Sequence, residues 1–124
     1  MKKKIILLCF IITFPLFSEE NSEVAANEKN PPSIESIRKG KKLFTKHCIS
    51  CHGKDGHGKT TLGKVIPNMP DLANPAFLKG KSDQELFDFI TNGHPPMPSF
   101  KNLPEEERWD LVHYVRTFSD STEK

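Results

Sequence analysis

Two cysteines and a histidine lie within five residues near the middle of this 124-residue chain, in the order Cys48-Ile49-Ser50-Cys51-His52. Thiols at this spacing in a helix lie about one turn apart on the same side. They can reach the two vinyl groups at one side of a porphyrin, and the histidine that follows offers its imidazole to the iron. The C-x-x-C-H spacing is the attachment pattern of a covalent haem. We therefore expect one haem c, bound by Cys48 and Cys51, with His52 as an iron ligand.

Two other uses of these residues compete with haem. A redox-active Cys48–Cys51 pair of the thioredoxin type is expected among alternating strands and helices, and no stretch of this chain alternates like a strand over five or more residues. A zinc site would use both cysteines, His52 and His57, but these ligands crowd into ten residues and lack a separated second pair. We favour haem attachment over both.

Met97 is the candidate for the second iron ligand. It lies 45 residues after His52, in the segment Gly93-His94-Pro95-Pro96-Met97-Pro98. Three prolines exclude regular helix and stiffen the backbone, which suits a weak thioether ligand. Methionine–histidine ligation also raises the reduction potential of the iron and suits reversible electron transfer. Met69 and His94 remain competitors, and a methionine that fills a gap in the core is the structural alternative. We expect His57 and His113 to be solvated.

The first 33 residues predict an export signal and a leader. Lys2, Lys3 and Lys4 precede a run of 13 residues, 5–17, with almost no polar member. This run has the length of a signal h-region and is shorter than the roughly 20 residues that span a bilayer. We expect a signal peptide at 1–18, a flexible leader at 19–33 and one domain at 34–120. The protein would then be periplasmic, with no stable membrane span after cleavage; an uncleaved signal would leave a membrane anchor.

The charge balance gives no support to nucleic-acid binding. The chain has 18 basic and 16 acidic residues, and removal of residues 1–18 takes away three lysines and no acid, which leaves a net charge of −1. The same cleavage removes Cys9, so Cys48 and Cys51 become the only cysteines. An exported chain with one close cysteine pair has either a local disulfide or a cofactor attachment site.

Helical patterns dominate between residues 33 and 118. The first helix is predicted over Ile34–His47, with Ser33 as its N-cap. Gly40 shares the apolar face of this helix, which indicates that another helix crosses very close there, unless Gly40 is a neutral surface residue. The last helix is predicted to open at Pro104. Its apolar stripe consists of Leu111, Val112, Val115 and Phe118. Two aromatic residues flank this stripe, Trp109 and Tyr114.

A further helix is predicted over Asp83–Asn92. Ser82 and Glu85 have the spacing of a capping box, and Gly93 is a C-terminal stop. We expect its buried stripe to consist of Leu86, Phe89 and Ile90. A short helix is predicted between Asn74 and Gly80. The glycine-rich stretch 53–70 has no periodicity and predicts a long ordered loop. Such a loop is unusual in a compact domain, and a cofactor around which it wraps would explain it.

Taken together, residues 34–118 resemble the monohaem cytochrome c family of class I. The resemblance implies an all-α fold, a cytochrome c-like small helical domain wrapped around one covalent haem, with crossing N- and C-terminal helices. Pro70-Asp71-Leu72 resembles the segment whose proline carbonyl accepts a hydrogen bond from the proximal histidine, with the leucine on the haem face. Pro70 and Leu72 are therefore expected haem-binding residues, and the bond would orient His52. Residues 93–100 resemble the methionine loop of that family.

The function that follows is a one-electron carrier, or an electron-entry module in a respiratory or dehydrogenase chain, and not an enzyme. We expect a monomer whose redox partners the sequence does not name. Six lysines lie in segments that would surround an exposed haem edge and could dock an acidic partner, namely Lys54, Lys59, Lys64, Lys79, Lys81 and Lys101. The alternatives are a haem enzyme or a gas- or peroxide-binding protein with a labile sixth ligand, and a fixed subunit of a larger complex.

Overall fold

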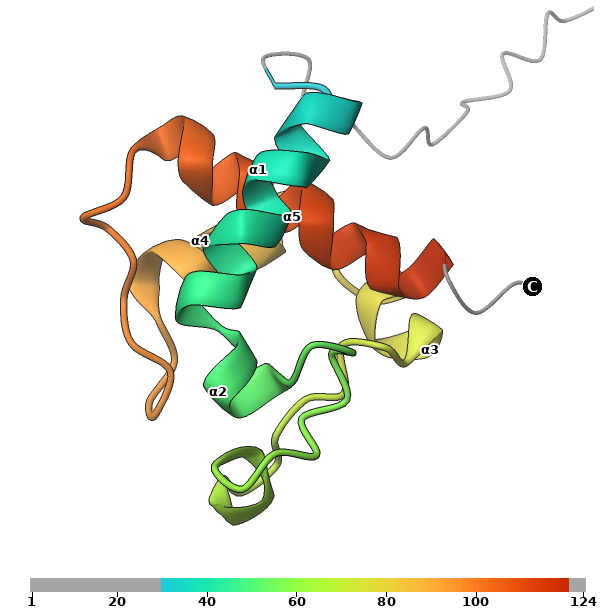
Figure 1. Ribbon diagram of the computed structural model, residues 1–124, viewed down its shortest axis with the longest axis vertical. Coiled ribbons are helices and arrows are strands. Elements are labelled where there is room, and N and C mark those ends of the chain that lie inside the picture. The colour runs from blue at the N-terminus through green and yellow to red at the C-terminus, as the bar shows by residue number, and fades with distance from the viewer. Residues whose placement is uncertain (1–29, 121–124) are drawn as a thin grey trace, which may run out of the picture.

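The computed structural model describes residues 30–120, and the predicted signal peptide lies outside them. This part of the chain is helical, and its only extended pairing is an isolated bridge between His94 and Met97. The all-α prediction is confirmed. No helix among the described residues is long and apolar enough to cross a membrane. The elements, shown in Figure 1, are α1 (Ile34–His47), α2 (Ile49–His52), the 3-10 turn η1 (Gly63–Val65), α3 (Pro75–Lys79), α4 (Asp83–Asn92) and α5 (Glu105–Asp120).

Helix α1 begins and ends where the sequence predicts. The Ser33 side chain accepts a hydrogen bond from the Ser36 amide, and the Ser36 hydroxyl accepts one from the Ser33 amide. Both amides, which have no partner within the helix, are thereby satisfied. The helix buries Gly40 and Phe44 on one face. At its end the amide of Cys48 donates to the Phe44 carbonyl at 2.8 Å, so α1 leads directly into the cysteine motif.

Helices α1 and α5 cross, as Figure 1 shows, and the contacts of Gly40 place the crossing at this residue, as predicted. An ideal Cβ on Gly40 would overlap the backbone carbonyl oxygen of Asp110 and lie 2.8 Å from the Cβ of Tyr114. Any larger residue would have to push α5 away. The reading of Gly40 as a neutral surface residue is therefore wrong. This crossing brings the two ends of the domain together and places Phe44 beside Tyr114, with ring centroids 5.3 Å apart.

Helix α4 has the predicted bounds and capping box, but its buried stripe differs from the prediction. Leu86, Phe87 and Ile90 are buried, whereas Phe89 is 41% exposed. Phe87 instead of Phe89 faces α5, because it stacks on Trp109 with centroids 4.3 Å apart and an interplanar angle of 19°. Phe87 and Phe89 fit helical periodicity beside Leu86 equally well, so only the position of α5 selects between them.

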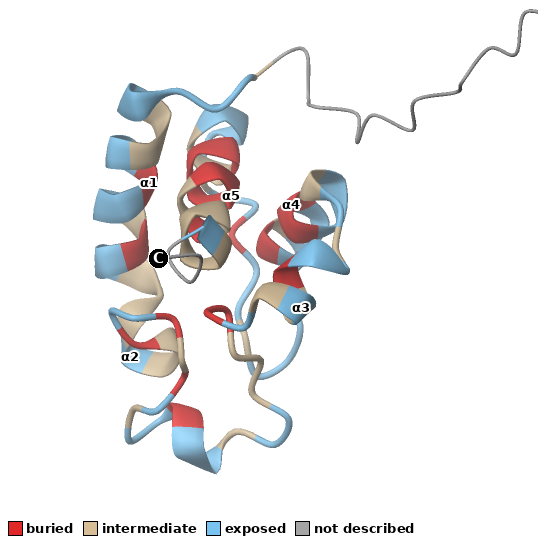
Figure 2. Ribbon diagram, turned by 90° about the vertical axis from the view of Figure 1, so that its right-hand side faces the viewer, coloured by how far each residue is buried: buried red, intermediate tan, exposed pale blue. Residues whose placement is uncertain are grey.

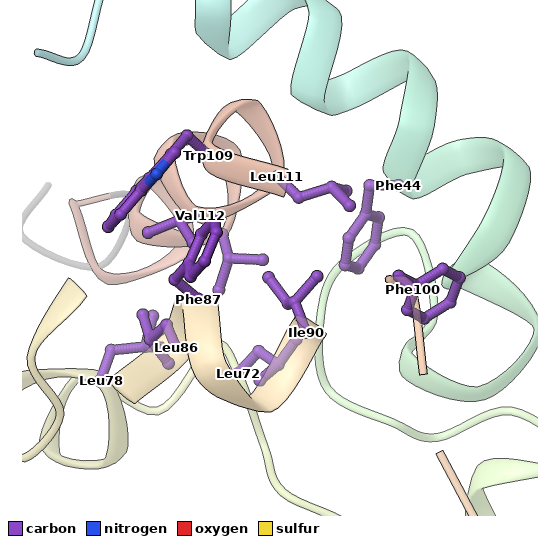
Figure 3. Close-up of a cluster of buried hydrophobic side chains, with 11 residues drawn as sticks. Phe44, Leu72, Leu78, Leu86, Phe87, Ile90, Phe100, Trp109, Leu111 and Val112 are labelled. Atoms are coloured by element: carbon purple, nitrogen blue, oxygen red, sulfur yellow. The ribbon is translucent and has the colours of Figure 1, made fainter. Parts of the chain in front are cut away.

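One apolar cluster joins α1, α4 and α5 with the residues after the long loop. Figure 3 shows Phe87 and Trp109 at one side of this cluster and Phe44 and Phe100 at the other. Arg116 joins α5 to the end of α3 and the start of α4. Its guanidinium donates to the Asp83 carboxylate at 2.6 Å and to the carbonyls of Leu78 and Lys81. Helix α5 starts at Glu105, one residue after the predicted start, and Pro104 contributes the first carbonyl acceptor.

The stretch 53–70 is a loop, as predicted, with η1 as its one helical turn. Its Thr60 hydroxyl donates to the carbonyls of Ser50 at 2.7 Å and Cys51 at 3.1 Å. The amide of Leu72 closes the loop by donating to the Gly56 carbonyl at 2.9 Å. Figure 2 shows the loop extending away from the helices below α2. Thr60 therefore fastens the loop to the cysteine motif, and the bond from Leu72 to Gly56 closes the loop on itself.

Candidate haem site

The cysteine motif forms one helical turn at the end of α1. The amides of Cys51 and His52 both donate to the Cys48 carbonyl, at 3.2 and 2.9 Å. This is the geometry that the spacing predicts, with both thiols on the same side of a single turn. The two cysteines are half-buried and are not joined by a disulfide. Cys48 packs against the apolar cluster, so the motif faces the core at its first cysteine.

Burial determines the chemistry of the Cys48 thiol. Desolvation, and next the neighbouring Cys51, raise the pKa of Cys48 to about 12. A thioredoxin-type dithiol needs a lowered thiol pKa, because the thiolate is the nucleophile. The surroundings of Cys48 therefore disfavour a redox-active pair.

The imidazole of His52 lies beside the core with a free nitrogen. Its ring centroid is 6.2 Å from that of Phe44, and burial lowers the pKa of His52, which favours the neutral form that binds metals. Among the described residues, the buried Nδ1 of His52 has no hydrogen-bond partner. The bond to the Pro70 carbonyl that the resemblance implies is thus not formed in this structure. That carbonyl lies beside Gly58, whose amide donates to the His52 carbonyl at 2.8 Å.

Met97 lies in a tight turn that several bonds fasten to the end of α4. The amides of His94 and Met97 donate to each other's carbonyls, at 3.0 and 2.7 Å. The Ser99 hydroxyl donates to the Thr91 carbonyl at 2.7 Å, and the Phe100 amide donates to the Ile90 carbonyl at 3.1 Å. The partly buried Met97 packs against the same cluster as Cys48. A segment distant in sequence thus brings a thioether to the core that the cysteine motif faces.

The competing ligands lie elsewhere. His94 is exposed, and its ring stands edge-on to the exposed ring of Phe89, with centroids 6.1 Å apart. Met69 lies against Gly58, where an ideal Cβ would be 3.0 Å from the Met69 Cγ, and the Gly58 amide bonds to the His52 carbonyl. Met69 is therefore close to the backbone of His52 itself. This arrangement favours Met97 over both competitors.

Leu72 and Pro70 end the long loop next to the motif. Leu72 is buried in the apolar cluster, with 7% of its surface exposed, and Pro70 is half-buried. The structure also identifies two contributors that the sequence did not suggest, the ring of Phe44 beside His52 and the hydroxyl of Thr60 under the motif. Neither contact has a local sequence signal, because each joins segments with no fixed spacing between them.

His57 and His113 both form polar contacts within the fold. His57 is half-buried, and its Nδ1 lies 3.0 Å from the Asp71 carboxylate. Within residues 30–120, no group of three or more His, Cys, Asp or Glu residues could hold a metal ion. His113 was expected to be solvated, and this is wrong: it is 5% exposed, and its Nδ1 lies 2.9 Å from the Ser36 hydroxyl. Its burial follows from the crossing of α1 and α5.

Comparison with known proteins decides the family. A family model described as "Cytochrome C oxidase, cbb3-type, subunit III" matches residues 35–115, which include the cysteine motif and Met97. The chain belongs to this cytochrome c family. The solved structure of the KustC0563 c-type cytochrome is similar as well, with 34% sequence identity and a TM-score of 0.57 over 64% of this chain and 95% of that one. The monohaem cytochrome c resemblance is therefore confirmed.

Curated relatives of this cytochrome are subunits of respiratory complexes. A cbb3-type cytochrome c oxidase subunit FixP of Rhizobium meliloti is 29% identical over 73% of this chain and 30% of its own length. A cytochrome bc1 complex cytochrome c subunit of Corynebacterium diphtheriae is 27% identical over 77% of this chain and 32% of its own length. The chain thus spans about a third of the length of these relatives.

The residues of this cytochrome fit the covalent haem c that its family binds. The motif supplies two thiols and an imidazole on one helical turn, and a thioether packs on the core that the motif faces. These are the donor types that thioether attachment and histidine–methionine ligation use. The cofactor is therefore one covalent haem c.

Proposed function

We propose that this cytochrome is an exported one-electron carrier, or an electron-entry module, of a respiratory chain. Cys48 and Cys51 attach the haem, His52 and Met97 ligate its iron, and Leu72 packs on its face. In the haem-loaded protein the Pro70 carbonyl would accept a hydrogen bond from the Nδ1 of His52, which would fix the orientation of the imidazole and raise its basicity. Bound haem c supplies an iron that alternates between the ferrous and ferric states and so carries one electron.

The observation that carries this proposal is the convergence of Cys48 and Met97 on one apolar cluster. Their burial supplies the dry surroundings that tune a haem potential, and the loop bonds hold a weak thioether in position. If His52 and Met97 both ligated the iron, no open position would remain on it for a substrate. We therefore infer that the protein is not an enzyme.

The partners and the location follow from the names of the relatives and from the N-terminal pattern. The oxidase and bc1 relatives support donors and acceptors of a respiratory chain. Residues 1–18 have the pattern of an export signal, which supports a periplasmic location. We expect the mature protein, with its domain at 34–120, to be a monomer that meets its redox partners transiently.

The test is the optical spectrum of the exported protein in the oxidised and dithionite-reduced states. We expect the reduced c-type α band together with the weak far-red band that marks methionine sulfur on ferric haem. An α band without the far-red band would refute Met97 ligation. The absence of haem bands in a host with a working maturation system would refute haem attachment at Cys48 and Cys51.

A pair of variants separates electron transfer from gas or peroxide binding. Met97→Ala should abolish the far-red band, lower the reduction potential and allow carbon monoxide to bind the reduced protein, because it opens the sixth position. Met69→Ala is the matched control and should leave all three properties unchanged. Rapid and complete carbon monoxide binding by the parent protein would contradict the carrier role and support the labile-ligand alternative.

A further inference from the structure

The outward side of α1 carries a dense set of basic side chains. Gly40 and Phe44 face the core, and the opposite side of this 14-residue helix is exposed. We call this exposed surface the basic face; its residues are Arg38, Lys39, Lys41, Lys42 and Lys46. Figure 2 shows the exposed side of α1 along one edge of the molecule. The helix has a single acidic residue, Glu35, whose carboxylate pairs with Arg38 at 2.6 Å.

Most of this positive charge is uncompensated. No ion pair within residues 30–120 involves Lys41, Lys42 or Lys46. Six acidic residues lie instead on two other helices: Asp83, Glu85 and Asp88 on α4, and Glu105, Glu106 and Glu107 near the start of α5. The outward side of α1 therefore carries a net positive charge. Clustered like charges without partners produce a local potential that attracts anions.

The basic face lacks the features of a protein-binding surface. Its hollow is shallow and is lined by Arg38, Lys41, Lys42 and Thr45. The one large apolar residue exposed on α1 is Ile34, at the start of the helix, with 89% of its surface exposed. Stable protein interfaces centre on buried aromatic or arginine anchors in fitted pockets. Diffuse positive charge along a straight helix instead suits an extended anionic surface, such as a layer of phospholipid headgroups.

We propose that the basic face binds this cytochrome peripherally to an anionic phospholipid surface. The orange segment before α5, which includes Met97, and the green long loop project at other sides of the molecule than α1 (Figure 1). Adsorption through α1 therefore leaves both segments near the haem attachment site open to a redox partner. The carrier would diffuse in two dimensions along the membrane instead of through the whole compartment.

The experiment measures co-sedimentation of the purified, mature haem protein with vesicles. Vesicles of equal parts phosphatidylglycerol and phosphatidylcholine are compared with phosphatidylcholine alone, at about 20 and about 500 mM salt, between which the screening length falls several-fold. Haem absorbance reports the bound fraction. We expect binding only to the anionic vesicles, and only at low salt. Binding that persists at high salt would indicate insertion of an apolar segment and would overturn the proposal.

Matched double variants locate the surface. Lys41→Ala with Lys42→Ala should weaken binding about 25-fold, because each lysine near an anionic surface contributes roughly a factor of five. Lys59→Ala with Lys101→Ala removes the same charge from exposed sites in the long loop and after Met97, and should weaken binding less than about threefold.

Two further outcomes would overturn the proposal. Equal losses in the two double variants would show that net charge, and not the basic face, causes binding. Absence of binding to anionic vesicles at low salt would refute it directly and leave an acidic protein as the partner of this face. The haem spectrum is recorded for every variant, so a failure of the electron-carrier proposal stays distinguishable from a failure of this one.

Discussion

The crossing of α1 and α5 predicts that Gly40→Ala destabilises the protein, although helix propensity alone predicts that this substitution stabilises it. Replacing glycine by alanine inside a helix ordinarily stabilises it by about 1 kcal/mol. At Gly40 an ideal Cβ would overlap the Asp110 carbonyl oxygen and lie 2.6 Å from its carbon and 2.8 Å from the Tyr114 Cβ. Carbon atoms in contact prefer about 3.5–4.0 Å, so α5 would have to move by about 1 Å.

The two effects can be compared in magnitude. Overpacking a core costs about 1–3 kcal/mol, and the upper end applies because backbone atoms cannot rotate away. Subtracting the gain in helix propensity, we expect Gly40→Ala to lower the free energy of unfolding by about 2 kcal/mol. For a domain of this size, that corresponds to a fall in the melting temperature of roughly 8–16 °C.

The assay is thermal and guanidinium unfolding of the haem-loaded protein, followed by far-ultraviolet circular dichroism. Gly80→Ala is the matched control, because its Cβ would meet its nearest neighbours, the Ala76 and Phe77 carbonyl oxygens, at 3.4 and 3.6 Å. The control should change the free energy of unfolding by less than about 1 kcal/mol. A gain of about 1 kcal/mol in Gly40→Ala would show that propensity dominates and that the helices can separate freely.

Three further changes test other parts of the structure. Arg116→Lys removes the planar guanidinium that bonds Asp83 and two carbonyls, so unfolding should become easier by about 2 kcal/mol, and an unchanged denaturation midpoint would contradict this. Burial lowers the pKa of His113, so as the pH falls the unfolded state binds the proton before the folded state does. The free energy of unfolding should therefore decline below about pH 6.5, by at most about 1.4 kcal/mol per pH unit. His113→Gln should flatten the unfolding free energy measured between neutral and mildly acidic pH, and an identical slope in both proteins would disprove the assignment. Gly93 has a φ of 73°, and a Cβ there would lie 2.8 Å from the Met97 carbonyl oxygen, so Gly93→Ala should destabilise the fold by about 2 kcal/mol and weaken the far-red methionine band. A full-strength band with unchanged unfolding would contradict that expectation.

Features that depend on neighbours in sequence were predictable. The capping residues Ser33 and Ser82 set the starts of their helices, because each accepts a bond from an amide three residues away. The glycine after α4 and the prolines around Met97 likewise act on adjacent backbone. The C-x-x-C-H motif belongs to the same class, since its chemistry needs only one helical turn.

Features that depend on packing were predicted less well. Periodicity could not distinguish Phe87 from Phe89, because both lie beside Leu86 on the helix surface, and α5 approaches only the first. The sequence pattern predicted His113 to be solvated, but the fold buries it against Ser36, which lies 77 residues earlier in the chain. In each case the deciding neighbour comes from a distant segment.

The sequence by itself determined the cofactor and most of the helices, and it predicts the attachment residues, because these properties are local and follow from spacing. Only the tertiary structure decided that Met97 faces the core while His94, three residues earlier in the same turn, lies against the exposed Phe89. It also gathered the lysines of α1 into an outward surface by turning Gly40 toward α5. The physical reason is the same in both cases: the apolar core selects one side of each segment, and the opposite side stays exposed to solvent.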